Sequence, residues 1–215
     1  MTDKFTLTLE QNLFAAKRGM VDYIYHSAKL EGCNVTFPET YTILEGVNVG
    51  SVTLDDIQTI LNLRDAWRFV MCTLEEAFTP TYLCKINEYI SRNESLAWGV
   101  LRTGGVGISG TEYKPPLPTP ESAQALIDGL TGTATQRAIA FFLLGCRAQL
   151  FWDGNKRTST LAANKILMQA GAGIFAIREK DALEFNTRLL DYYNTGDLSV
   201  IDRWLYDNCI EGIEL

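Results

Sequence analysis

Residues 149–160 carry the side chains of this sequence that are best suited to chemistry. The segment reads Gln-Leu-Phe-Trp-Asp-Gly-Asn-Lys-Arg-Thr-Ser-Thr. Asp153 could hold a hard cation such as Mg²⁺, because such cations prefer carboxylate oxygens. Lys156 and Arg157 place two positive charges beside it, and a phosphate group would pair with both. From the spacing alone, a phosphate-binding turn and an ordinary helix–helix turn with solvated charges are equally supported.

The elements on either side would place this segment at the start of a helix. Residues 138–150 are apolar on almost every face, which is typical of a buried helix. Residues 158–170 carry apolar side chains at helical spacing, and Gly171 is a stop signal. We therefore expect a tight turn between two core helices. The N-terminus of the second helix would offer free backbone N–H groups and a positive helix end, which bind phosphate.

The remainder of the chain predicts an all-α architecture. Residues 11–30 form an amphipathic pattern that should end near Gly32. Further helix signals are the starts at Thr36, Thr53, Thr79 and Thr119 and the patterns over 182–193 and 199–210. The exception is 98–116, where glycines punctuate β-branched and aromatic residues. This pattern predicts a hairpin around Gly104-Gly105.

Composition excludes several classes of protein. A chain of 215 residues suits one domain, or one domain with a modest extension. Its net charge of −7 disfavours nucleic-acid binding, which needs a basic face. No apolar run reaches the ~18 residues of a membrane span, and the first residues do not resemble a signal peptide. Five scattered cysteines without a C-x-x-C pair predict reduced thiols in a cytoplasmic protein. A single histidine makes a structural zinc site unlikely.

The segment described first resembles the signature of the Fic/Doc (Fido) family. That signature reads His-x-Phe-x-Asp/Glu-Gly-Asn-Gly/Lys-Arg, followed by two residues and often a second Arg. The matching positions are Phe151, Asp153, Gly154, Asn155, Lys156 and Arg157. Gln149 stands where the family has its His, and Thr160 stands where many members have the second Arg. The sequence Gly-Asn-Lys-Arg-Thr resembles the Doc branch of the family more than the branch with Gly-Asn-Gly-Arg.

A second stretch resembles the flap that precedes this motif in the family. Its matching residues include Arg102, Val106 and Ile108. The resemblance implies that the flap aligns a segment of a target protein over the active site. Taken as a pattern alone, the same stretch is a surface hairpin that joins two helices.

A third stretch resembles the inhibitory pattern of the family, Ser/Thr-x-x-x-Glu-Gly/Asn. Ser27, Glu31 and Gly32 fit it, at a position similar to members whose inhibitory helix is N-terminal. The resemblance therefore implies an N-terminal extension with an inhibitory-type helix over 1–50. A Fic domain would follow over 51–215, folded as a Fic-type helical bundle with a short β-hairpin flap.

The resemblance also implies an activity, a cofactor and a partner. Fic proteins typically use ATP and Mg²⁺ to transfer AMP to a protein hydroxyl. The partner would be a target protein that presents a Ser, Thr or Tyr hydroxyl, with self-modification as a further possibility. Neither a nucleic acid nor a membrane is expected as a partner. The implied roles are metal ligand for Asp153, phosphate contacts for Gly154, Asn155, Lys156 and Arg157, and adenine enclosure for Tyr193.

The two departures from the pattern leave three functions open. Gln149 takes the position of the catalytic base, and a carboxamide has no useful basicity near neutral pH. His26, the only histidine, lies far away in the sequence. Glu31 lacks the second Arg as a partner because Thr160 replaces it, so Lys156 or Arg157 would have to pair with it. The chain is then an atypical AMP transferase, a degenerate nucleotide- or partner-binding protein, or a Doc-like phosphotransferase.

Overall fold

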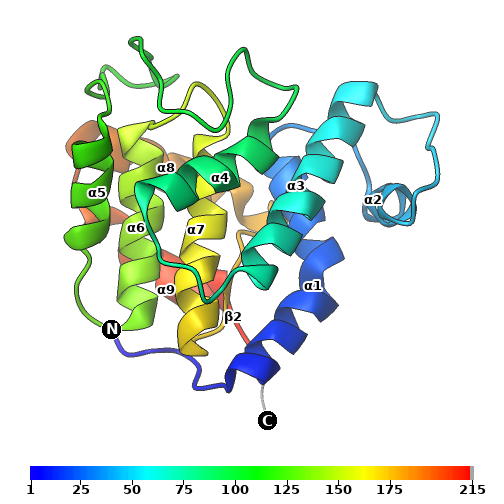
Figure 1. Ribbon diagram of the computed structural model, residues 1–215, viewed down its shortest axis with the longest axis horizontal. Coiled ribbons are helices and arrows are strands. Elements are labelled where there is room, and N and C mark those ends of the chain that lie inside the picture. The colour runs from blue at the N-terminus through cyan, green and yellow to red at the C-terminus, as the bar shows by residue number, and fades with distance from the viewer. Residues whose placement is uncertain (214–215) are drawn as a thin grey trace.

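Helices make up nearly all of the fold in the computed structural model, which describes residues 1–213 (Figure 1). In chain order the elements are α1 (Leu9–Leu30), α2 (Phe37–Leu44), α3 (Leu54–Cys72), α4 (Pro80–Ser91), α5 (Pro120–Asp128), α6 (Ala134–Ala148), α7 (Asn155–Ala170), β1 (Ile174–Phe175), η1 (Glu179–Asp181), α8 (Ala182–Thr195), η2 (Leu198–Val200), α9 (Asp202–Cys209) and β2 (Ile210–Glu211). The predicted predominantly helical fold is confirmed. Residues 214–215, the end of the expected second region, lie outside the described residues. Across residues 1–213, no helix has the length and apolar character that a membrane crossing requires.

Threonine side chains cap the starts of the first six helices. Each hydroxyl accepts a hydrogen bond from the backbone N–H three residues further on, which satisfies one of the free donors of the first turn. The starts predicted from Thr36, Thr53, Thr79 and Thr119 are therefore correct. These boundaries follow from local chemistry alone, because cap and capped amide lie within one turn.

Helix α7 is the central element of the bundle. It contacts α1, α3, α4 and α6, and Figure 1 shows α6 and α7 side by side near the middle of the molecule. Nearly all of its side chains are buried, including the polar Asn164 and Lys165. As a result, the first turn of α7 lies near the C-terminal ends of α1, α4 and α6. Side chains from four distant parts of the chain can meet there.

The second core helix begins three residues earlier than the periodicity predicts. It starts at Asn155 rather than at residue 158, and Gly154 precedes it with φ +71°. This left-handed conformation favours glycine. A Cβ at Gly154 would also collide with Ser91 Oγ and lie 2.6 Å from Ile90 Cγ2. The glycine therefore lets the chain enter the helix close against α4, and the charged residues of the segment become the first helical turn.

The predicted hairpin at 98–116 is wrong. Among residues 1–213 the only sheet is a two-stranded antiparallel one elsewhere, in which Ile174 pairs with Glu211 and Phe175 with Ile210. The flap is an irregular loop instead. The buried guanidinium of Arg102 links its two arms, because it donates to the carbonyl of Gly104 on one arm and to those of Pro115 and Pro116 on the other. The turn of this loop lies at 109–110, where the Thr111 amide donates to the Ile108 carbonyl, and not around Gly104-Gly105 as predicted.

Candidate functional site

A cleft of about 500 Å³ opens at the first turn of α7. Its lining combines the expected loop, the end of α1, the flap and helix α8. The lining residues are Glu31, Ile108, Ser109, Gln149, Trp152, Asp153, Gly154, Asn155, Lys156, Asn186, Leu189, Leu190 and Tyr193. The structure therefore brings together residues from segments more than a hundred positions apart. Val106 is half buried on the same flap but does not line the cleft.

The start of α7 presents backbone donors to this cleft. No side chain caps the helix, so the amides of its first turn are not taken up by a cap. Gly154 in the left-handed region followed by helical residues is the backbone arrangement of an anion-binding nest. Lys156 adds a positive charge on the same turn, with its side chain 26% exposed. This end of the cleft is suited to a phosphate or carboxylate group.

Hydrogen bonds from both sides hold the loop before α7 rigid. Asn155 Nδ2 donates to the Phe151 carbonyl (2.8 Å), and Asn155 Oδ1 accepts from the Phe151 amide (2.9 Å). From α4, Asn87 Nδ2 donates to the carbonyl of Asp153 (2.9 Å). The carbonyl of Asp153 is thus fixed, while its side chain, 49% exposed, faces the cleft. An exposed carboxylate on a rigid loop can take up a hard cation without rearrangement of the loop.

Gln149 ends α6 in a left-handed conformation, with φ 46° and ψ 59°. Its side chain is engaged at both ends: Nε2 donates to the Cys146 carbonyl (2.7 Å), and Oε1 accepts from Asn155 Nδ2 (3.1 Å). The backbone carbonyl of Gln149 accepts from Arg102 Nε (2.6 Å). Gln149 therefore supports the loop, and its neutral amide cannot take a proton from a hydroxyl group.

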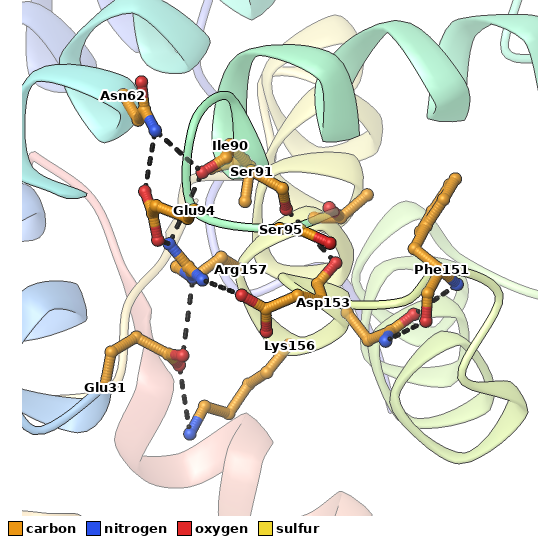
Figure 2. A network of polar contacts seen from close by, with 12 residues as sticks. Glu31, Asn62, Ile90, Ser91, Glu94, Ser95, Phe151, Asp153, Lys156 and Arg157 are labelled. Carbon is orange, nitrogen blue, oxygen red and sulfur yellow. Dashed lines mark hydrogen bonds and ion pairs between the residues drawn. The ribbon is translucent and has the colours of Figure 1, made fainter. Parts of the chain in front are cut away.

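Arg157 is the centre of a buried charge network (Figure 2). Only 4% of its side chain is exposed, and three carboxylates surround it. Glu94 Oε2 lies 2.6 Å from Nη1, Asp153 Oδ2 lies 3.3 Å from Nη2, and Glu31 Oε2 lies 3.4 Å from Nε. Burial lowers the pKa of Arg157, but the charges of Glu31 and Glu94 outweigh this effect and raise it above its usual value.

Glu31 joins α1 to this network. It is the C-cap residue of α1, and its Oε1 lies 3.2 Å from Lys156 Nζ, which also donates to the Leu30 carbonyl (3.1 Å). Gly32 follows with φ +88°, and its amide donates to the Lys29 carbonyl (3.0 Å), so the helix ends there. Glu31 thus contacts both cations of the loop, the alternative left open by the missing second Arg. Its carboxylate therefore lies between the ammonium of Lys156 and the guanidinium of Arg157.

Ser27 and Thr160 lie on the other side of Arg157. Together with Tyr23, Leu30 and Arg157 itself they line a small cavity of about 20 Å³. His26, in contrast, is turned away from the loop. Its Nδ1 accepts from the Glu179 amide (3.2 Å), so it cannot act as the base of this cleft.

Three residues of the site carried no recognisable sequence signal. Glu94, just after α4, accepts from Arg157, and Asn62 of α3 donates to Glu94. Trp152 forms part of the cleft wall with its side chain 40% exposed. A carboxylate just after a helix and an asparagine inside one are common anywhere. Trp152 stands inside the motif, but at a position where the family pattern accepts any residue. Arg102 was expected to face a target protein, yet its side chain is 1% exposed and points into the protein.

The chain is similar to proteins of one known family. The family model described as "Fic/DOC family" matches residues 77–167. Among curated proteins, the chain is 27% identical over 214 residues to "Protein adenylyltransferase Fic" of Aedes aegypti, covering 92% of this chain and 41% of that protein. It is 28% identical over 204 residues to the protein of the same name from Nematostella vectensis, covering 89% and 47%. The chain thus spans less than half the length of these relatives.

Solved structures show the same fold. Fic-1 (residues 134–508) from C. elegans superposes with a TM-score of 0.78 at 22% identity, covering 91% of this chain and 62% of that one. A Fic domain containing signaling protein from Bacteroides thetaiotaomicron gives a TM-score of 0.72 at 18% identity, covering 94% and 85%. At these identities the likeness shows the fold alone.

Proposed function

This chain belongs to the Fic/DOC family, and we propose that it binds Mg·ATP in the cleft at the first turn of α7, with AMP transfer held back by Gln149. One observation carries the proposal. The uncapped amides of α7, the Lys156 ammonium and the Asp153 carboxylate line one end of the cleft, and apolar residues of α8 line the other. A nucleotide has the matching division into charged phosphates and a flat apolar base.

The residues present fit a magnesium ion that is shared with a nucleotide. Within residues 1–213 no group of three or more potential metal-binding side chains occurs, so the protein alone does not build a complete metal cage. Mg²⁺ commonly uses one or two carboxylates together with substrate phosphates and water. Asp153 would be that carboxylate. When bound, the ion would neutralise phosphate charge and polarise the phosphoryl group.

The remaining contacts would be divided between phosphates and base. Lys156 and the amides of Gly154 and Asn155 would bind phosphate oxygens. Arg157 would add its charge once Glu31 moves from it. Tyr193 lines the opposite side of the cleft and would contact the adenine.

Glu31 is proposed to act as the inhibitory carboxylate of this chain. Its contacts with Lys156 (3.2 Å) and Arg157 (3.4 Å) compete with a phosphate group for the same two cations. Ser27 and Gly32 set the last turn and the end of its helix. Under this proposal residues 1–50 form an N-terminal extension that carries the inhibitory helix, and residues 51–215 form the Fic domain.

A second candidate function is AMP transfer itself, which the names of the curated relatives favour. The acceptor would be a Ser, Thr or Tyr hydroxyl of a target protein or of the chain itself. A positioned general base contributes about 10²–10⁴-fold to such a step, and Gln149 cannot act as one. Doc-like phosphate transfer is the third candidate, supported by Lys156 in the motif.

Calorimetric titration with Mg·ATP tests the binding proposal. We expect saturable binding that weakens in Asp153→Ala and Lys156→Ala, whose side chains are 49% and 26% exposed and can be removed without opening the core. Glu88→Ala, an exposed carboxylate on α4, is the matched control. Affinity that is equal in all four proteins would refute binding at this cleft. Mass spectrometry after incubation with lysate then separates AMP transfer, phosphate transfer and binding alone.

A further inference from the structure

Glu94 differs from the other two carboxylates around Arg157. Glu31 and Asp153 both line the cleft, whereas Glu94 does not. Glu94 is also the least exposed of the three, with 13% of its side chain accessible against 21% for Glu31 and 49% for Asp153. Its contact with Arg157 is the shortest, at 2.6 Å between Oε2 and Nη1.

A chain of hydrogen bonds fixes Glu94 from behind. Asn62 Nδ2 donates to Glu94 Oε1 (2.6 Å) and to the Arg92 carbonyl (2.8 Å), which ties the carboxylate to α3 and to the end of α4. Gln58 Nε2 in turn donates to Asn62 Oδ1 (2.8 Å). In Figure 2, Asn62 and Glu94 lie on one side of Arg157, and Glu31 lies on the other. The two oxygens of Glu94 therefore have separate partners, one on the scaffold and one on Arg157.

We infer that Glu94 is a positioning residue, which holds the buried Arg157 guanidinium in place while Glu31 and Asp153, the cleft-lining carboxylates that contact it, exchange their partners. The inference rests on the proposed function, because the exchange is that of Glu31 for a nucleotide phosphate. A cation that is buried among carboxylates is costly if it loses all of its partners at once. When a metal ion engages Asp153 and a phosphate displaces Glu31, Glu94 is the one carboxylate of the three that keeps its partner.

A positioning carboxylate and an inhibitory carboxylate have opposite effects on nucleotide affinity. A carboxylate that competes with phosphate weakens nucleotide binding, so its removal strengthens binding. A carboxylate that orients Arg157 toward the phosphate strengthens binding, so its removal weakens it. Glu31 and Glu94 contact the same guanidinium and should therefore give opposite results when neutralised.

The test compares Glu94→Gln with the wild-type chain by calorimetric titration of Mg·ATP, together with thermal unfolding of each protein. Glutamine keeps the size of the side chain, but its single oxygen can accept from Asn62 or from Arg157 and not from both. We expect the affinity to fall about tenfold, as for the loss of one charge-assisted hydrogen bond. Glu88→Gln is the matched control and should leave the affinity unchanged. Equal or tighter binding in Glu94→Gln overturns the inference.

A second variant covers the case in which Glu94→Gln does not fold. Asn62→Ala keeps the Glu94 charge but removes the donor that orients it, and we expect an intermediate, few-fold loss of affinity. Wild-type affinity in Asn62→Ala overturns the inference in that case.

Arginine side-chain NMR separates this inference from the proposed function. The Nε and Nη signals of Arg157, assigned with Arg157→Lys, should be resolved in the wild type because the guanidinium is held. They should broaden or shift in Glu94→Gln and remain in place in Glu88→Gln. If neither the wild type nor Glu31→Gly binds nucleotide, the proposed function fails, and these spectra alone decide whether Glu94 orients Arg157. Unchanged Arg157 signals in Glu94→Gln overturn the inference.

Discussion

Two buried arginines flank the loop that joins α6 to α7, and their charges are compensated in opposite ways. Arg102 is 1% exposed and donates only to backbone carbonyls, among them those of Gln149 (2.6 Å) and Gly104 (2.6 Å). Arg157 is 4% exposed and is surrounded by three carboxylates. Burial lowers the pKa of Arg102, whereas the surrounding charges raise the pKa of Arg157 despite its burial.

The two arginines therefore belong to two kinds of structure. We call Arg102 with its carbonyl partners the fixed joint, and Arg157 with its carboxylate partners the exchangeable site. Backbone carbonyls cannot leave, so Arg102 ties the flap permanently to the end of α6. The carboxylates of Glu31 and Asp153 are side chains that line a cleft, and under the proposed function a phosphate or a metal ion would replace their contacts with Arg157.

The largest expected effect is on AMP transfer and comes from a change at Gln149, whose carbonyl accepts from Arg102. Gln149→His, combined with Glu31→Gly, should raise AMP transfer about 10²–10⁴-fold over the Glu31→Gly parent, because an imidazole can accept the hydroxyl proton. Arg102 fixes the backbone of this position, so the change should affect the side chain alone. Labelling with radioactive ATP, with purified protein and with lysate, measures the gain. No label in the double variant would leave a binding protein as the only function.

Loss of the fixed joint should be the largest effect on stability. Arg102→Met should lower the free energy of unfolding by about 3 kcal/mol, because buried carbonyls lose their donor. Arg102→Lys keeps the charge but cannot reach all of these carbonyls, so it should recover only part of the loss. Urea titration of both variants checks this. A loss below about 1 kcal/mol for Arg102→Met would contradict the structural role given to Arg102.

The exchangeable site should respond in affinity rather than in stability. Asp153→Ala should weaken Mg·ATP binding about 10- to 100-fold, since a charge-assisted contact contributes about 1.5–3 kcal/mol. Its unfolding midpoint should stay close to that of the wild type, because half of the side chain is exposed. A large drop in stability with unchanged affinity would place Asp153 with Arg102 among the structural residues.

Removal of Glu31 should have the opposite sign. Glu31→Gly should tighten Mg·ATP binding about tenfold, as the competing carboxylate leaves Lys156 and Arg157. Glu31→Gln, which loses the charge but keeps the side chain, is the control and should give a similar gain. Weaker binding in both variants would make Glu31 part of the fold rather than of the regulation.

Lys165 is a third buried cation, and its effect on the pH dependence of stability should be the smallest of the predicted effects. Its Nζ donates to the carbonyls of Thr73 (2.9 Å) and Leu74 (3.0 Å), and burial lowers its pKa to about 8 from 10.5, with Glu76 opposing the shift. The unfolded chain therefore binds this proton more tightly than the folded one, and the contribution of Lys165 to stability rises with pH between these values.

Between pH 8 and pH 9 this contribution should grow by about 1 kcal/mol. This contribution is measured as the difference in unfolding free energy between the wild type and Lys165→Met at each pH. Contributions from other titrating side chains are common to both proteins and cancel in the difference. A difference that does not change with pH would mean that Lys165 keeps its proton in the fold, as Arg102 does.

Much of this protein is determined by local sequence. The threonine caps lie within a turn of the amides they bind, so Thr36, Thr53, Thr79 and Thr119 mark helix starts in any context. The two core helices follow from their apolar periodicity. Between them the sequence also predicts a short polar turn with a phosphate-binding character, because glycine, charge and helix start are adjacent in the chain.

Only the tertiary structure decided which charges meet. Glu31 reaches Lys156 across 125 positions and Glu94 reaches Arg157 across 63, and no periodicity encodes either contact. The flap was wrongly predicted as a hairpin for the same reason. Arg102 connects the flap to the carbonyl of Gln149 at the end of α6, 47 positions away in the sequence. Hydrogen bonds within one turn can be read from the chain, but burial of a charge depends on which helices close around it, and that is set only when the bundle is assembled.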